Sequence, residues 1–282
     1  MKSVFGQLAG VVAAVALCVG SANLAAAQPK RKKAGKAKPK RVAVNVVKSI
    51  ANLQSADVDT SRKAAKRLGF TRDARALEAL LNRLALGAHP KVAAAALTSV
   101  ARYASPKAHD TVKLYLGYRD SRVRAAAVTA LGSIKQARTV KPILAALRDG
   151  TKTVRAAACK VIEKRKIRQA IEALLALMKK GDEATAPAVA AMANPNLARL
   201  VGELIGKAPN SVVARTLGLI LLRPSFKPEN ARVEVVKALG KVPGTDAVEQ
   251  LSAYLEAIPE KPPRQSRRMA QKYLETRLGG GN

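Results

Sequence analysis

Aromatic side chains are scarce in this chain of 282 residues, where they make up 3% of the sequence and include no tryptophan. A single globular core of this length normally contains more aromatic bulk, because large rings bury more area than other side chains. Hydrophobic residues nevertheless make up 48% of the chain. This balance indicates thin layers of alanine and leucine between helices, as in a solenoid, rather than one thick core.

Acidic side chains are also few, since 19 aspartates and glutamates stand against 51 lysines and arginines, a formal net charge of +32. The carboxylates are scattered, so no pair of them stands out for acid–base catalysis. A chain this basic is expected to bind an acidic partner, which could be a protein, a polynucleotide or other polyanion, or an anionic membrane. The alternative is that the charge reflects a generally basic proteome.

The motifs of common enzyme classes are missing. There is no glycine-rich phosphate loop, no His-Glu-x-x-His, no Cys-x-x-Cys and no Gly-x-Ser-x-Gly. His89 and His109 have no second ligand at metal-binding spacing, so we expect both at the surface or in turns. Cys159 follows the apolar pattern of its segment and is expected to be a small core residue. The sequence therefore predicts a non-enzymatic protein with no catalytic residue, metal or other cofactor.

What the chain does contain is a repeat. Residues 120–132 read Asp-Ser-Arg-Val-Arg-Ala-Ala-Ala-Val-Thr-Ala-Leu-Gly, and residues 151–163 read Thr-Lys-Thr-Val-Arg-Ala-Ala-Ala-Cys-Lys-Val-Ile-Glu. Val123 thereby recurs as Val154, 31 residues on. The apolar positions 140, 143, 144 and 147 recur at 171, 174, 175 and 178 with the same offset. A period of this size indicates a repeat architecture.

Each repeat is predicted to contain two helices. The apolar positions 123, 126, 127, 130 and 131 fall on one face of a helix, and positions 140, 143, 144 and 147 do the same for a second helix. Gly132 and Gly150 follow these helices and suit their C-terminal ends. The predicted fold is an all-α, right-handed solenoid of helical hairpins over residues 42–278.

These residues resemble the HEAT repeat, in particular the short HEAT-like repeats first described in phycobilisome lyases. Repeats of that family carry an aspartate in the turn and an arginine six positions on, as Asp149 and Arg155 do here. The preceding copy departs from the pattern, because Tyr118 stands at the aspartate position of Arg124. The resemblance implies an architecture rather than a function, because such repeats serve scaffolds, enzymes and nucleic-acid binders alike.

The paired charges of the repeats are interpreted as structural. An Asp–Arg ladder that ties adjacent repeats explains them better than a binding site does. We assign to this ladder Asp120, Arg124, Asp149, Arg155 and Arg232. Further helices are predicted at residues 42–53, 60–68, 197–205, 211–222, 232–240, 245–256 and 264–278. The signature of the repeat returns at 232–240 one helix out of order, so we expect a bend or irregular packing between residues 193 and 232.

Residues 1–27 have the features of an export signal, with Lys2, an apolar run and three alanines before Gln28. This predicts a mature protein in the periplasm or outside the cell. Residues 28–41 are predicted to form a disordered basic arm, and residues 279–282 a disordered tail. Basic clusters after an apolar run are typical of cytoplasmic flanks, so the alternative is an inner-membrane anchor with a cytoplasmic solenoid.

The predicted function is that of a scaffold which presents a basic surface to an acidic partner protein. The candidate partner-binding residues are the cations of the arm and those near predicted turns: Lys30, Arg31, Lys32, Lys33, Lys36, Lys38, Lys40, Arg41, Lys91, Arg119, Arg122, Lys152, Lys164, Arg165, Lys166 and Arg168. One alternative is a binder of nucleic acid or another polyanion, although dispersed aromatics disfavour base stacking and export would exclude genomic DNA. Another is a peripheral binder of anionic membranes.

Overall fold

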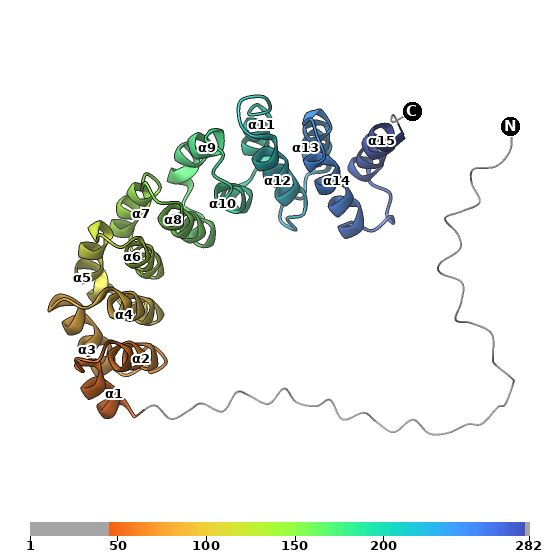
Figure 1. The fold of residues 1–282 in the computed structure, drawn as a ribbon. Helices are drawn as coiled ribbons and strands as arrows, with labels where there is room; N and C mark the ends of the chain where they lie inside the picture. The colour runs from red at the N-terminus through yellow and green to blue at the C-terminus, as the bar shows by residue number, and fades with distance from the viewer. Residues whose placement is uncertain (1–44, 280–282) are drawn as a thin grey trace, which may run out of the picture. The chain divides into compact units, whose positions relative to one another are not determined.

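Helices alternate between two rows in the computed structural model, which describes residues 45–279 (Figure 1). Short 3₁₀-helices occupy some of the turns, and this part of the chain contains no β-strand. The predicted all-α solenoid is therefore confirmed. The predicted export signal (1–27) and basic arm (28–41) lie outside the described residues, as do residues 280–282 of the predicted tail.

The inner row follows the concave side of the curved stack, and the outer row follows its convex side (Figure 1). The inner helices are α2 (Val58–Leu68), α4 (Pro90–Tyr103), α6 (Ser121–Ser133), α8 (Lys152–Arg165), α10 (Thr185–Met192), α12 (Asn210–Leu221) and α14 (Asp246–Ala257). The outer helices are α1 (Val46–Leu53), α3 (Ala74–Ala85), α5 (His109–Leu114), α7 (Val140–Ala146), α9 (Ile171–Lys179), α11 (Pro195–Gly202), α13 (Glu229–Lys241) and α15 (Gln265–Gly279).

Local sequence signals mark where the helices begin and end. The carboxylates of Asp57, Asp73 and Asp120 accept backbone N–H groups two or three residues on, at 2.8–2.9 Å, and so cap α2, α3 and α6. Ala104 and Lys166 end α4 and α8 in the left-handed conformation, with φ of 50° and 53°. The chain therefore reverses sharply after these inner helices.

Small residues bring the inner helices close together. A Cβ atom on Gly132 of α6 would lie 2.4 Å from Cγ2 of Val161 in α8, and one on Gly69 would meet the side chain of Ser99. Neighbouring helices in the inner row all touch, whereas the outer helices α5, α7, α9 and α11 are in little contact with one another. Close packing on one side and wider spacing on the other curve the stack.

The core consists of two buried clusters that meet at α6. Val123, Ala127 and Leu131 belong to the cluster on the N-terminal side, and Val128 belongs to the cluster that extends to α15. No described helix is long and apolar enough to cross a membrane.

The side chains predicted to face the core divide into two groups in α7. Ile143 and Leu147 are fully buried, whereas Val140 and Leu144 are only partly covered. The prediction for His109 was wrong, because this side chain is buried at the start of α5, with Nδ1 2.7 Å from Oδ1 of Asp110. Cys159 is a free core cysteine, and burial raises the pKa of its thiol to about 12.

The irregularity expected between residues 193 and 232 is a change in the row of helices that carries the repeat signature. Inner and outer helices keep alternating through α10, α11, α12 and α13. The helix that regains the repeat signature, α13, nevertheless lies in the outer row, whereas its counterparts α6 and α8 lie in the inner row. Longer turns at residues 203–209 and 222–228 accompany this shift.

Candidate partner-binding surface

A groove of about 500 Å³ opens on the concave side across α2, α4 and α6. Ala94, Ala95 and Thr98 of α4 lie at its centre, and the Thr98 hydroxyl donates to the carbonyl of Ala94 at 2.8 Å. Small side chains on α4 leave the depression, and longer charged side chains on α2 and α6 form its walls. The residues around the groove are Asp59, Arg62, Lys66, Pro90, Lys91, Ala94, Ala95, Thr98, Asp120 and Arg122.

Two ion pairs neutralise part of the charge in this groove. The guanidinium of Arg62 lies 3.0 Å from Asp59, and that of Arg122 lies 3.0 Å from Asp120. Hydrogen bonds from Arg122 hold the pKa of Asp120 below its usual value, so this carboxylate is ionised at neutral pH. Asp120 thus pairs with its neighbour Arg122 and takes no part in a ladder with Arg124.

Lys66 and Lys91 supply the remaining charge of the groove. Both are exposed, and neither forms an ion pair within the described residues. The groove therefore holds four cations against two carboxylates, with two ammonium groups free to meet an anionic ligand.

A second groove, of about 470 Å³, lies between the outer helices α11 and α13. Its walls are largely self-neutralised, because Arg199 pairs with Glu203 and Lys237 pairs with Glu234. Lys241 is the one further cation among its lining residues. This groove has less electrostatic preference for an acidic ligand than the concave one.

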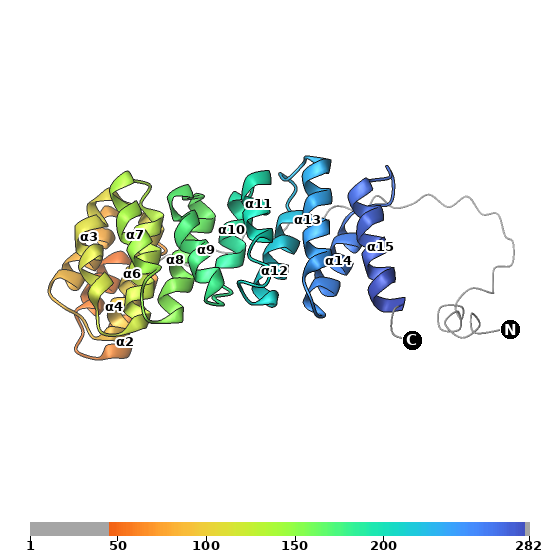
Figure 2. The ribbon, with the colours of Figure 1, turned by 90° about the horizontal axis from the view of Figure 1, so that it is seen from above.

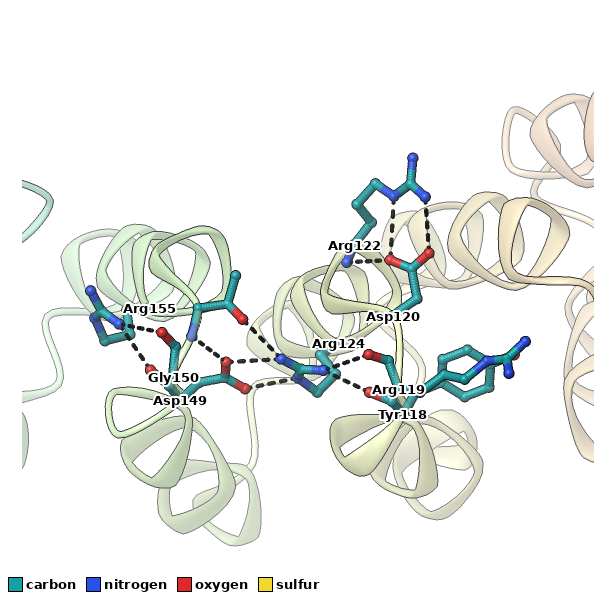
Figure 3. Close-up of polar contacts among 9 residues, drawn as sticks. Tyr118, Arg119, Asp120, Arg122, Arg124, Asp149, Gly150 and Arg155 are labelled. Atoms are coloured by element: carbon teal, nitrogen blue, oxygen red, sulfur yellow. Dashed lines mark hydrogen bonds and ion pairs between the residues drawn. The ribbon is translucent and has the colours of Figure 1, made fainter.

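Arginines link three consecutive inner helices near their N-terminal ends, and Figure 3 shows the first of these links, between α6 and the turn before α8. Arg124 of α6 binds both oxygens of Asp149, with Nε 2.8 Å from Oδ2, and also the hydroxyl of Thr151. Arg155 of α8 makes the equivalent contact with Asp182, at 2.6 Å. The hydrogen bonds from Arg124 hold the pKa of Asp149 below its usual value.

Each of these arginines also binds the turn of its own repeat. Arg124 donates to the carbonyl of Tyr118 at 2.8 Å, and Arg155 donates to the carbonyl of Asp149 at 3.0 Å (Figure 3). Arg155 thus contacts only the backbone of Asp149, while the ion-pair partners of these two side chains, Arg124 and Asp182, belong to neighbouring repeats. Arg232 keeps only the turn contact, from Nε to the carbonyl of Phe226 at 2.8 Å.

Comparison with known protein families identifies part of the chain that contains these arginine contacts. Residues 77–151, which include Arg124 and Asp149, match the family of HEAT repeats. The resemblance to HEAT repeats expected from the sequence is confirmed over these residues, which run from α3 to the residue before α8.

Similar solved structures are also repeat proteins and their complexes. The complex of CpcE and CpcF of phycocyanin lyase from Nostoc sp. PCC7120 is 18% identical, with a TM-score of 0.47 over 89% of this chain and 99% of that chain. A designed armadillo repeat protein is 15% identical, with a TM-score of 0.37 over 82% of this chain and 98% of that chain. No curated protein sequence matches the chain.

The direction of the HEAT helices divides the predicted cations between two opposite edges. Lys91, Arg119, Arg122 and Lys152 lie at the edge where the inner helices begin. Lys164, Arg165, Lys166 and Arg168 lie at the other edge, where α8 ends. The structure therefore does not bring them together into one surface. The predicted cations of the arm, from Lys30 to Arg41, lie outside the described residues.

Arg165 differs from its neighbours in this second group. Its guanidinium donates to the hydroxyl of Thr139 at 2.7 Å and to the carbonyls of Ile134 and Gln136. It holds the end of the preceding inner helix instead of facing solvent. Arg165 is thus partly buried and held within the protein, whereas Lys164, Lys166 and Arg168 are exposed.

Two further arginines, which were not predicted from the sequence, also donate to carbonyl groups at the end of a neighbouring helix. Arg223 donates to the carbonyls of Ala190 and Ala193 at the end of α10, at 2.8 and 3.0 Å. Arg277 donates to carbonyls at the end of α13, including that of Val242 at 2.6 Å. Each follows or ends a helix, where a cation is favoured by the helix dipole, and that position was the available signal.

Proposed function

We propose that the protein is a non-enzymatic HEAT-repeat scaffold that binds an acidic segment of a partner protein in the concave groove. The observation that carries the proposal is the pair of free ammonium groups, Lys66 of α2 and Lys91 at the start of α4, beside a depression with a small-residue floor. Such a groove suits an extended chain with carboxylates, since its own ion pairs leave no free carboxylate on the floor.

A labelled oligoglutamate peptide tests this proposal by fluorescence anisotropy at physiological ionic strength. The double variant K66Q/K91Q should bind about tenfold more weakly, because each exposed charge contact contributes up to about 1 kcal/mol. The matched control K179Q/K180Q removes the same charge from exposed lysines at the end of α9 and should bind nearly as well as the parent. Equal losses in both variants would show that net charge alone attracts the peptide.

The proposal extends to location. The apolar run and alanine-rich cleavage site of residues 1–27 support export of a chain that begins at Gln28. The intact mass of protein isolated from its native cells tests this, because a mass that includes residues 1–27 would leave the anchored alternative.

A further inference from the structure

The edge where the inner helices end carries a row of exposed cations that form no ion pair among the described residues. We call the turns that follow α4, α6 and α8 the basic edge. Its exposed cations without an ion pair among the described residues are Lys107, Lys135, Lys164, Lys166 and Arg168. The carboxylate of Asp110, beside these turns, already lies 4.0 Å from Arg138. Glu163 and Glu172 flank the turn after α8, and the edge keeps a net positive charge.

The basic edge is level because the inner helices run parallel and in register. Arg124 joins the starts of α6 and α8, and Arg165 joins their ends. Arg223 joins the ends of α10 and α12 in the same way. In the view from above, the helices stand next to one another along the stack (Figure 2). Successive turns can thus touch one flat surface together.

Apolar side chains are exposed at the same edge. Phe70 follows α2 and is 68% exposed, whereas the other aromatic side chains of residues 45–279 are buried or half-buried. The guanidinium of Arg102 lies 4.0 Å from the centre of its ring. Val47 is 69% exposed in the first turn of α1, an outer helix that begins at this edge. A ring with a cation on its face suits a boundary between apolar and charged layers.

We propose that the basic edge binds the surface of an anionic lipid bilayer. Lysine and arginine side chains of successive turns would contact lipid phosphates and carboxylates, while Phe70 enters the headgroup region and Arg102 stays with the phosphates. The binding is peripheral, since the described helices are too short or too polar to span a bilayer.

A bilayer fits this edge better than a nucleic acid does. Single strands are held by a series of aromatic platforms, and the described surface offers only Phe70. The row of turns also follows the arc of the solenoid (Figure 1), which a stiff duplex cannot follow without bending. A flat anionic surface meets all the turns without deformation. The inference stands independently of the proposed concave groove, because the two surfaces share no residue.

Sedimentation of the full chain with vesicles of phosphatidylcholine and phosphatidylserine tests the proposal. The variant K135Q/K164Q/K166Q should lower the partition coefficient about a hundredfold, because each lysine near an anionic surface contributes roughly a factor of five. The control K113Q/K179Q/K180Q removes the same charge from exposed lysines at the opposite edge and should change it less than about threefold. Phe70→Ala should weaken binding to these vesicles by about tenfold.

Three results would overturn the proposal. Equal losses for the two triple variants would mean that net charge alone drives adsorption. Equal binding to vesicles of pure phosphatidylcholine would remove the role of anionic lipid. Tighter binding to oligothymidylate than to vesicles, lost in Phe70→Ala, would assign the edge to nucleic acid instead. Circular dichroism melts of every variant establish that these exposed substitutions leave the fold intact.

Discussion

The ion pair between Arg124 and Asp149 differs from that between Arg122 and Asp120 in its surroundings. The side chains of Arg124 and Asp149 are 18% and 15% exposed, whereas Arg122 is 77% exposed. Water screens the Arg122 pair and reduces its contribution to stability. The Arg124 pair also satisfies hydrogen bonds to two turns, so its removal leaves polar groups without partners.

Asp149→Asn should therefore lower the free energy of unfolding by about 2 kcal/mol at pH 7. Asp120→Asn is the matched control, since both carboxylates also accept a backbone N–H that asparagine can still bind. We expect the control to lose less than about 1 kcal/mol in urea unfolding. Equal losses would contradict a structural role for the ladder.

The pH dependence of this contribution follows from the lowered pKa of Asp149. A carboxylate with a depressed folded-state pKa stabilises the fold fully above its unfolded-state pKa, near 3.8. The stabilisation is lost as pH falls through the lower folded-state value. The difference between the parent and Asp149→Asn should thus be constant near neutral pH and shrink in acid.

Residue patterns in the sequence predicted the ladder arginines but not their partners. The ladder was predicted to tie adjacent repeats, but the six-residue spacing of Asp149 and Arg155 did not specify which aspartate pairs with which arginine. Arg155 reaches Asp182, because adjacent inner helices start at the same level and the turn of the next repeat comes within range. Arg165 was likewise predicted to be a free cation in a turn. Its contacts with residues 134–139 depend on the register between adjacent helices, which the sequence does not show.

Helix positions were predicted well even where the 31-residue recurrence has faded, after residue 178. Residues 211–222 were expected to be helical, and α12 spans Asn210–Leu221. Positions 140 and 144 were expected on the buried face, but only the neighbouring Ile143 and Leu147 are fully covered. The outer helices are short and widely spaced, so one face of α7 remains partly open. The spacing of apolar residues shows which face of a helix is apolar. It does not show how much of that face a neighbouring helix covers.

Close contact between inner helices depends on glycine at one position of α6. Gly132→Ala should destabilise the protein by about 1–3 kcal/mol, because the new methyl group would overlap the side chain of Val161. Gly150→Ala is the control, since no atom lies within 4 Å of its added Cβ. Urea midpoints measure both, and Val161→Ala should partly rescue Gly132→Ala. A neutral Gly132→Ala would mean that α6 and α8 are farther apart.

At the scale of the whole molecule, the sequence predicted a basic solenoid but not how its charge is distributed. Cations near turns were grouped as one surface, whereas a helical hairpin has turns at two opposite edges. Lys91 and Arg122 border the concave groove, and Lys164 and Lys166 lie on the basic edge. Separating these groups requires the direction of each helix in the stack. A scaffold with two separate basic surfaces can hold two partners at once.

The claim that the concave groove is the site for an acidic partner is tested most directly by photocrosslinking. An oligoglutamate peptide carrying a benzophenone is irradiated with the full chain, and the attachment points are mapped by mass spectrometry. We predict that they cluster on α2, α4 and α6 around Lys66 and Lys91, and that K66Q/K91Q removes them. Attachment spread evenly over the exposed lysines, or concentrated on the turns after α6 and α8, would contradict the account.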